Sequence, residues 1–202
     1  MNQATELKME QAAKASSVRS TPVESRINPR GRFKVEHWRA GKLIGEYEFS
    51  NGITNQGKNN LLDVHFHAAT QISVWYLGMI DNDGYTALAA GDTYQNIDQA
   101  GNGWDEFTDY TDAANGDSAT TRPTWTEGAA ASQAITNASP VIFDITASGT
   151  VKGLFLVGGI AAAQTKGDHA ADGILWATAL FTTGDVAVNA DDQLKVTYTV
   201  SA

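Results

Sequence analysis

The amino-acid sequence predicts an all-β protein: a two-sheet β-sandwich with one short helix and an extended N-terminal arm. Apolar and polar residues alternate with a period of two over several segments of strand length, and turns rich in Gly, Asn and Asp separate these segments. Hydrophobic residues make up 42% of the 202 residues, which is enough for a substantial core. Among sandwiches we favour a jelly roll, while an immunoglobulin-like strand order remains open.

The N-terminal part lacks the strand pattern, so we divide the chain into an arm over residues 1–31 and a β-sandwich domain over residues 32–202. Residues 2–18 contain good helix formers, but their apolar positions are too sparse for a helix without a partner. Residues 16–31 contain two prolines and show no periodicity, which indicates an extended strap. Chain termini are ordinarily disordered, and we expect the arm to become ordered only on assembly.

The β domain opens with a predicted hairpin and a helix. Phe33, Val35 and His37 fall on one face, a turn follows at residues 40–41, and the alternation resumes over residues 43–49. The next segment predicts a helix of about three turns, whose N-terminal cap is Thr54 or Asn55. Its apolar residues are Leu61, Leu62, Val64 and Phe66.

The remaining strands are predicted from apolar or alternating runs, giving eight or nine strands in all. These runs are ISVWYLGMI (72–80), PVIFDIT (140–146), TVKGLFLVGG (150–159), GILWATALF (173–181) and DQLKVTYTV (192–200), and TRPTWTEG (121–128) holds a short edge strand limited by its proline. Residues 81–121 form a long acidic connection. Loops of this length are uncommon in compact domains, so we expect it to fold onto the body or onto a neighbour.

The charge is unevenly distributed along the chain. Residues 1–43 contain nine Lys or Arg against four Glu, a net charge of +5. Residues 44–202 have a net charge of −14, so the whole chain has a net charge of −9. An acidic body repels nucleic acid, because binding to a duplex depends on neutralising its phosphates with clustered Lys and Arg. The basic arm is suited either to an acidic protein surface or to solvent.

The chain contains no cysteine, which excludes disulfides and thiolate chemistry. No apolar run approaches the roughly 20 residues that a membrane-spanning helix needs. Residues 1–20 lack the apolar stretch of a signal peptide. We therefore expect a protein that is made in the cytoplasm of the producing cell and has no membrane partner.

Two motifs are similar to metal sites, but neither is complete. His65 and His67 lie two positions apart on the predicted helix, where their side chains point in different directions and cannot easily share an ion. Residues 81–84 (Asp-Asn-Asp-Gly) resemble the opening of a calcium-binding EF-hand loop, but Thr86 and Asp92 occupy the positions of its Gly and its final Glu. We expect an ordinary turn and no metal site.

Acidic residues and tryptophans raise the possibility of carbohydrate chemistry. Two carboxylates flanking a sugar would serve glycoside hydrolysis, and exposed indoles such as those of Trp104 and Trp125 would stack on sugar rings. The available carboxylates are Asp98, Asp105, Glu106, Asp109, Asp112 and Asp117. No pair of them is marked out as one buried and one exposed, and nucleophile and phosphate-binding motifs are missing. We expect no enzyme and no cofactor; a carbohydrate-binding module using Trp104 and Trp125 remains an alternative.

Several motifs together resemble a group of small virion proteins encoded among the head genes of tailed bacteriophages. They are NGITNQGKNNLLDVHFH (51–67), WYLGMID (75–81), GWDEFTDY (103–110), RPTW (122–125), GILWATALF (173–181) and DQLKVTYTV (192–200). Residues 191–193 read Asp-Asp-Gln where the group has Gly-Asp-x, a departure that affects only a turn. The resemblance covers residues 51–200 and leaves the arm outside. Its motifs supply core aromatics, turns and a helix cap but no reactive groups.

The resemblance implies a cement or decoration protein with a jelly-roll body on the outside of a phage capsid, assembled onto the particle in the host cytoplasm. Its partners would be the major capsid protein and further copies of itself, as a dimer or trimer. The arm would bridge neighbouring capsid proteins. The contacts that we expect in the arm are the apolar Leu7, Met9, Val18 and Val23 and the basic Arg19, Arg26, Arg30 and Arg32. A tail or neck component is the alternative location.

Overall fold

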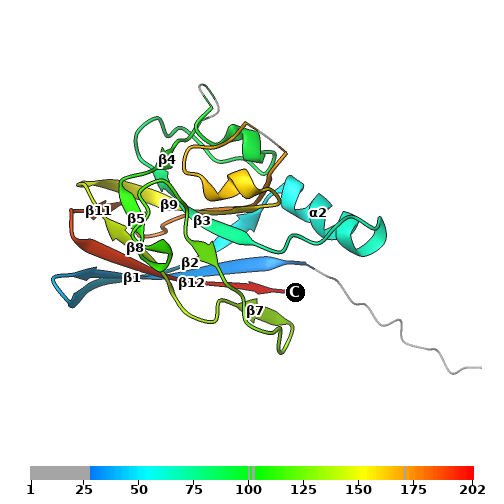
Figure 1. Cartoon of the computed structure of the whole chain (residues 1–202), viewed down its shortest axis with the longest axis horizontal. Coiled ribbons are helices and arrows are strands. Elements are labelled where there is room, and N and C mark those ends of the chain that lie inside the picture. Colours follow the sequence, from blue (N-terminus) through cyan, green and yellow to red (C-terminus); the bar gives the residue numbers. More distant parts are fainter. Residues whose placement is uncertain (1–27, 100, 102, 171) are drawn as a thin grey trace, which may run out of the picture.

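The computed structural model describes residues 28–99, 101, 103–170 and 172–202. Within these ranges the chain forms twelve β-strands, one α-helix and three short 3-10 helices (Figure 1). The all-β class is therefore confirmed. The predicted helix within residues 2–18 and the strap up to residue 27 lie outside the described part of the chain.

The first two strands form the predicted hairpin. β1 (Arg30–Arg39) and β2 (Lys42–Ile53) pair in antiparallel fashion, and the turn between them has left-handed backbone angles at both of its residues, Ala40 and Gly41. β1 begins inside the region that was assigned to the arm. Arg30 and Gly31 belong to the sheet because they pair with the end of the last strand, so the body starts two residues earlier than predicted.

All twelve strands belong to one antiparallel sheet with the order β4-β3-β9-β10-β2-β1-β12-β8-β5, and β6, β7 and β11 pair with β3, β12 and β9. The remaining strand bounds are β3 (Trp75–Asp81), β4 (Glu106–Phe107), β5 (Tyr110–Asp112), β6 (Thr124–Trp125), β7 (Ala134–Thr136), β8 (Val141–Ile145), β9 (Gly149–Gly158), β10 (Ile174–Leu180), β11 (Val186–Val188) and β12 (Asp192–Ser201). The prediction missed the short strands β4 and β5, which lie within the long connection, and the short strands β7 and β11.

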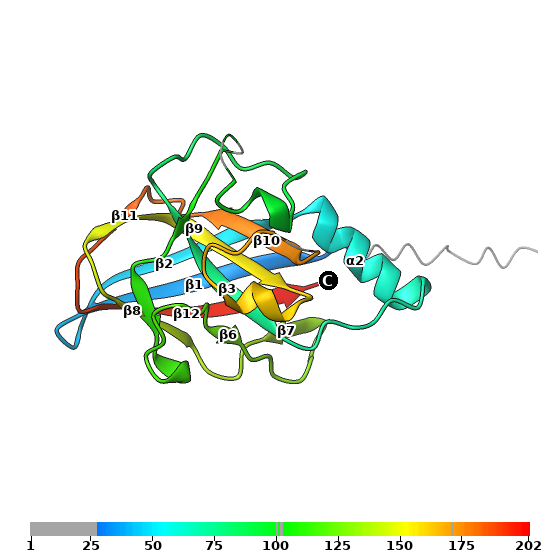
Figure 2. The same cartoon turned by 45° about the horizontal axis from the view of Figure 1, so that its top comes forward.

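The sheet folds back on itself instead of dividing into two sheets. β2 pairs with β1 along most of its length, and only Gly52 and Ile53 at its end pair with β10. The two edge strands of the sheet, β4 and β5, are separated in the sequence by only Thr108 and Asp109. The two edges therefore lie close together, and the sheet is nearly closed. Figures 1 and 2 show the resulting two layers. The two separate sheets of the predicted sandwich are thus not found among the described residues, because the backbone bonds at the end of β2 connect the layers.

The main core lies between the two layers. It includes Phe33, Phe143 and Leu194 from one layer and Leu77 and Leu154 from the other, all fully buried. Their positions follow the alternation that the sequence shows along each strand. The layer containing β3 and β9 is buried on both faces, which explains the almost continuous apolar runs in these strands.

The long acidic connection covers the outer face of β3 and β9. Trp104, Tyr94 and Ile97 form a second apolar cluster with Phe155 and Val157 of β9. The rings of Trp104 and Phe155 lie 5.3 Å apart. Of the two expectations for residues 81–121, packing on the body is therefore the one confirmed.

Helix α2 (Asn55–Phe66) extends from the end of β2 and projects beyond one end of the sheet (Figure 2). The Thr54 side chain accepts a hydrogen bond from the Gly57 N–H at 3.0 Å, which confirms one of the two predicted caps. Gly57 is buried against β10, where a Cβ atom would lie 2.6 Å from the Trp176 carbonyl oxygen. The helix thus packs its first turn tightly on the body, while its later turns are only partly covered.

Candidate functional site

A groove of about 350 Å³ opens between α2 and the adjacent end of the two-layered sheet; we call it the α2 groove. Its apolar walls are built from α2, six strands and the segment before β3. They comprise Leu61, Val64, Ile72, Trp75, Trp125, Ile135, Leu156, Trp176 and Val200, while Asn60, His65, Gln71 and Glu127 add polar groups. The groove continues the main core outwards, because Leu61, Trp75, Ile135 and Val200 pack against that core and are only partly buried.

The three tryptophans of the groove offer it mainly hydrocarbon surface. Trp125 and Trp176 direct their indole N–H groups into the body, where Trp125 donates to the Tyr198 carbonyl oxygen at 3.3 Å and Trp176 to the Tyr198 hydroxyl at 3.2 Å. Trp75 packs edge-on against Trp176 with ring centroids 5.7 Å apart. A groove with walls of this kind is suited to apolar side chains.

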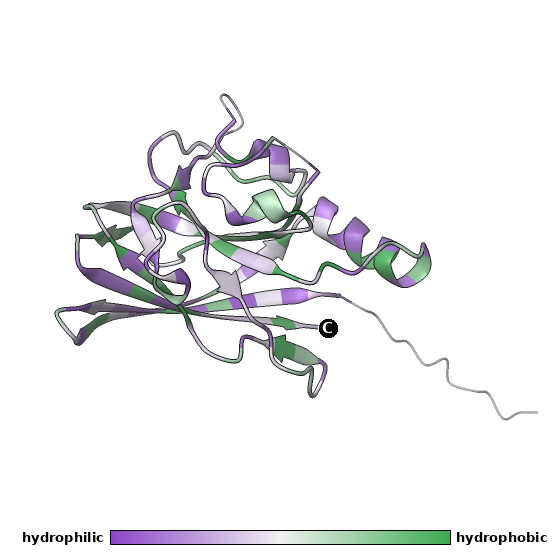
Figure 3. Cartoon of the chain, in the orientation of Figure 1, coloured by the Kyte–Doolittle hydropathy of each residue, from purple (hydrophilic) through white to green (hydrophobic). Residues whose placement is uncertain are grey.

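A second apolar feature lies on the same helix. Leu62 and Phe66 are four residues apart and 54% and 82% exposed, and together we call them the α2 ridge. In Figure 3 the later turns of α2 carry hydrophobic residues on the outside of the molecule. At the opposite end, the tip of the β1–β2 hairpin exposes Leu43 and Ile44 at 46% and 50%. Adjacent exposed apolar side chains of this size are typical of interaction surfaces.

The root of the arm lies at the rim of the groove. Gly31 is directly opposite Val200 in the pairing of β1 with β12, and Val200 is part of the groove wall. Of the residues predicted to contact the capsid, Arg30 and Arg32 are on β1, and Arg32 forms an exposed ion pair with Glu48 at 2.7 Å. Leu7, Met9, Val18, Arg19, Val23 and Arg26 lie outside the described residues.

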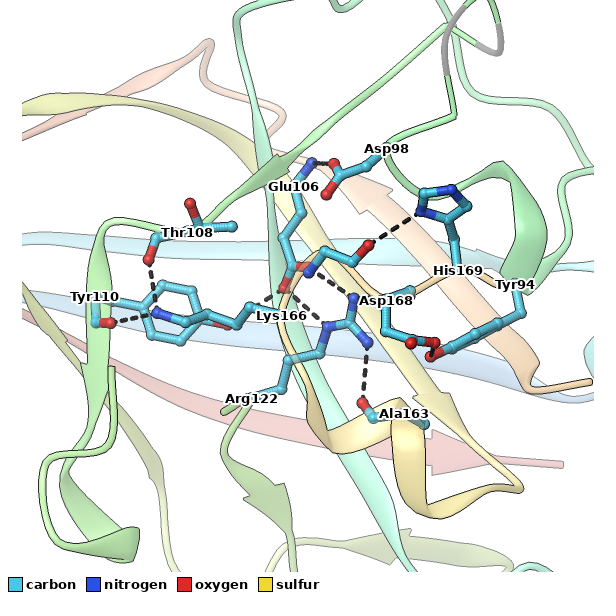
Figure 4. A network of polar contacts seen from close by, with 11 residues as sticks. Tyr94, Asp98, Glu106, Thr108, Tyr110, Arg122, Ala163, Lys166, Asp168 and His169 are labelled. Atoms are coloured by element: carbon cyan, nitrogen blue, oxygen red, sulfur yellow. Dashed lines mark hydrogen bonds and ion pairs between the residues drawn. The ribbon is translucent and has the colours of Figure 1, made fainter. Parts of the chain in front are cut away.

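A buried polar network surrounds Glu106 and Arg122 (Figure 4). Arg122 donates to both carboxylate oxygens of Glu106, at 2.9 and 2.7 Å, and both side chains are completely buried. Glu106 also accepts from the Tyr110 hydroxyl and the Gly167 N–H, while Arg122 donates to the Ala163 carbonyl oxygen. The network joins the long connection to the residues after β9. Because its polar groups are engaged with one another and shielded, it is a structural clamp.

The pKa values in this network follow from burial and charge. Burial raises the pKa of Tyr110, with a further contribution from the Glu106 carboxylate, and lowers that of Lys166. Burial alone would lower the pKa of Arg122, but the Glu106 carboxylate outweighs it, so the pKa is raised. A lysine with a lowered pKa is a candidate base. Lys166, however, donates to the carbonyl oxygens of Thr108 and Tyr110, both at 2.6 Å, and so holds the loop.

A second buried carboxylate lies at the hairpin end of the molecule. Asp192 accepts hydrogen bonds from Arg39 Nε and Nη2, both at 2.7 Å, and its carboxylate lies 2.8 Å from His37 Nε2. The Arg39 hydrogen bond overcomes the effect of burial and holds the pKa of Asp192 well below its usual range, with help from the Asn189 N–H and His37. This cluster fastens the end of β1 to the start of β12.

Among the candidate carboxylates of the long connection, Asp98 accepts a hydrogen bond from the Glu106 N–H, and burial raises its pKa, with further contributions from the Glu106 and Asp105 carboxylates. Glu106 is bound to Arg122, Asp112 accepts from the Ala114 N–H at 3.1 Å, and Asp105, Asp109 and Asp117 are exposed. In the described ranges, no group of three or more His, Cys, Asp or Glu side chains is placed to hold a metal ion.

The two incomplete metal motifs have ordinary structural roles. His65 is exposed on α2, and His67 is its C-terminal cap residue, 3.6 Å from Asp63. Asp81 accepts a hydrogen bond from the Asp83 N–H at 3.1 Å, as in a turn built on an acidic side chain.

The two tryptophans expected on the surface are buried, which corrects the prediction of an aromatic platform for sugars. Trp104 is 1% exposed and donates to Asp92 at 3.1 Å, and Trp125 is 4% exposed in the floor of the α2 groove. Each indole is buried because folding removes its large apolar area from water. Neither ring offers an open face on which a sugar could stack.

The sequence analysis did not identify the α2 groove or the Glu106–Arg122 pair. Leu61 and Val64 were noted only as apolar helix residues, and the tryptophans of β3 and β10 only as parts of strands. A usable signal for the pair was present, since Arg122 is the only cation between residues 81 and 151 of the sequence, in an otherwise acidic region. A cation in that setting needs a buried carboxylate partner.

Comparison with family models, with curated proteins and with solved structures gave no match to this chain. None of the helices in the described ranges has the length and apolar character that a bilayer span requires.

Proposed function

We propose that this chain is a structural protein of a tailed-bacteriophage particle that binds the outside of the capsid and bridges adjacent major capsid proteins through its arm. The observation that carries the proposal is the grouping of the α2 groove, the α2 ridge and the root of the arm at one end of the body. The buried polar groups elsewhere are occupied in holding the fold together. The proposed activity is therefore attachment, without catalysis.

The charge distribution supports this role. The acidic body does not favour contact with packaged nucleic acid. The basic arm would supply Arg19, Arg26, Arg30 and Arg32 to acidic surfaces of capsid subunits, and Leu7, Met9, Val18 and Val23 to apolar ones. An extended arm of this length reaches on the order of 100 Å. It would thus contact subunits beyond those under the body.

Contacts made by body and arm to different subunits would favour the closed capsid, because only the assembled lattice presents all of them. We include in the proposal self-association of the body as a dimer or trimer, and a jelly-roll relationship for its folded-over sheet. The support for the latter is the pairing of the first strand with the last in a two-layered antiparallel body.

Deletion of residues 1–27 tests the proposal, since β1 starts at Arg30 and the body keeps all of its strands. Particles assembled with the truncated chain should carry at least about tenfold fewer copies, because the arm contributes a second attachment. They should also lose heat resistance. The matched control replaces Arg19 and Arg26 with Lys, which keeps the length and the charge and should retain occupancy.

Three results would contradict the proposal. Unchanged occupancy and heat resistance of particles with the truncated chain would remove the arm from the mechanism. A handful of copies per particle, measured by quantitative gel staining of virions, would place the chain in the tail or neck. Specific retention of the purified protein on polysaccharide would favour a carbohydrate-binding module instead.

A further inference from the structure

The α2 groove is an open apolar surface, and β1, which follows the N-terminal segment in the sequence, starts beside it. The described chain starts with Asn28 and Pro29, just before β1, in which Gly31 is paired with the groove residue Val200. Asn28 is exposed, whereas Pro29 is partly buried. Figure 2 shows the start of β1 at the same end of the molecule as α2.

The register of β1 determines which residues would face the groove. Residues directly opposite each other in an antiparallel pair have their side chains on the same face of the sheet. Gly31 is opposite Val200, a wall of the groove, and Phe33 and Val35 on the same face of β1 are buried in the core. In an extended continuation of β1, residues 29, 27, 25 and 23 would therefore face the groove.

The sequence of this segment has the corresponding pattern. Residues 16–31 show no periodicity as a whole, but in residues 23–29 (Val-Glu-Ser-Arg-Ile-Asn-Pro) the apolar residues all occupy odd positions. Charged or amide residues occupy every even position. Alternation of this kind is typical of an extended segment with one face on an apolar surface. Four extended residues span about 13 Å, so Ile27 is within reach of the groove from Gly31.

We propose that residues 23–27 bind along the α2 groove of their own chain, with Val23 and Ile27 against its partly buried walls, Leu61, Trp75 and Val200. Attachment through β1 keeps the segment at a high local concentration, which allows a modest apolar contact to stay occupied. The assignment does not depend on a capsid. Under this proposal Val23 contacts its own chain and not the capsid. Residues 1–22 would then extend from the groove towards neighbouring subunits.

Tryptophan fluorescence of the purified full-length protein tests the contact, because Trp75 lines the groove and is only partly buried. The Ile27→Asp variant should shift the emission to longer wavelength and increase quenching by acrylamide, since a carboxylate disfavours an apolar site. The control is Asn28→Asp, which adds the same charge to the opposite face and should match the wild type. Deletion of residues 1–27 should reproduce the Ile27→Asp spectrum.

Limited trypsin digestion gives a second readout that does not involve changing the segment. In the wild type, cleavage after Arg26 should be about tenfold slower than in the free peptide of residues 1–29, because the bound segment must first detach. Cleavage after Arg19 should proceed at the peptide's rate. Val64→Asp in the groove should restore fast cleavage after Arg26, whereas Leu62→Asp on the α2 ridge should not.

The proposal is wrong if Ile27→Asp and Asn28→Asp both give the wild-type spectrum, or if Arg26 is cleaved as fast as in the peptide. It is also wrong if protection disappears on dilution about a hundredfold, since the segment would then come from a second copy of the chain. These measurements use isolated protein. Their failure would therefore leave the occupancy test on particles unaffected.

Discussion

Arg122 is completely buried and makes two hydrogen bonds to the carboxylate of Glu106, which is equally buried. Bringing both charges out of water is costly, so the pair is tolerated because every charged atom has a partner. The consequence is asymmetric. Removing one member leaves an unpaired charge in the interior, whereas removing both leaves no charge and only neutral polar groups without their partner, such as the Tyr110 hydroxyl and the Gly167 N–H.

We predict that Arg122→Ala lowers the free energy of unfolding by about 3–5 kcal/mol, because the Glu106 carboxylate loses its counter-ion. Urea unfolding at neutral pH measures the change. The double variant Arg122→Met with Glu106→Leu is the control and should recover part of the loss, because no charge remains unpaired. A loss below about 1 kcal/mol for Arg122→Ala would mean that water reaches the site and that the clamp does not hold the long connection.

Gly57 gives a second prediction for a single residue. In an exposed helix, replacing Gly with Ala normally stabilises by about 1 kcal/mol. At Gly57 the new Cβ would lie 2.6 Å from the Trp176 carbonyl oxygen, so α2 would have to move away from β10. We expect Gly57→Ala to destabilise the protein in thermal unfolding. Asn59→Ala on the exposed side of α2 is the control and should be neutral or stabilising; stabilisation by both changes would contradict the close packing of α2.

At the level of elements, the accuracy of the sequence prediction followed the range of the interactions involved. The β1–β2 hairpin and the Thr54 cap depend on neighbouring residues, and both were predicted. The short strands β7 and β11 were missed because three residues carry too little alternation to be recognised.

Long-range features could not be predicted in the same way. The exposure of Trp104 and Trp125 was predicted wrongly, because burial depends on which distant strands cover a side chain. The connection of the two layers depends on the pairing of Gly52 and Ile53 with β10, more than 120 residues away in the chain. The α2 groove likewise combines residues from α2 to the end of β12. None of these contacts leaves a local pattern in the sequence.

The junction of β1 and β12 predicts a pH dependence. The pKa of Asp192 is lower in the folded protein than in the unfolded chain, mainly because Arg39 donates to its carboxylate. The stabilisation is therefore complete above the unfolded pKa of about 3.9 and is lost as the pH falls below it. We expect Asp192→Asn to lower the free energy of unfolding by about 1–2 kcal/mol at pH 7 and to have a smaller effect near pH 3.

Urea unfolding of the wild type and the Asp192→Asn variant at both pH values measures this effect. The neighbouring Asp191→Asn is a matched control, because Asp191 is exposed and its left-handed backbone conformation suits Asn equally well. A constant difference between wild type and Asp192→Asn at pH 7 and pH 3 would show that the carboxylate charge does not stabilise the strand junction.

On the scale of the whole molecule, surfaces suited to association lie at the two ends of the strands. The α2 end carries the groove, the ridge and the root of the arm, and the hairpin end carries Leu43 and Ile44. If residues 23–27 fill the groove as we propose, the α2 ridge remains as an exposed apolar surface at the α2 end. Exposed adjacent apolar residues at one site favour contact with another copy or with a partner.

We therefore predict that self-association of the body depends on the α2 ridge. A variant with Leu62→Asp and Phe66→Asp should sediment as a monomer at concentrations where the wild type associates. Its free energy of unfolding should change by less than about 0.5 kcal/mol, since both side chains are exposed. Leu43→Asp with Ile44→Asp adds the same charge at the opposite end and should leave association unchanged. If only this second variant dissociates, the copies contact one another through the hairpin tip and the prediction is wrong. If the wild type is monomeric at all concentrations, the ridge does not mediate self-association and would contact a different partner, such as the capsid surface.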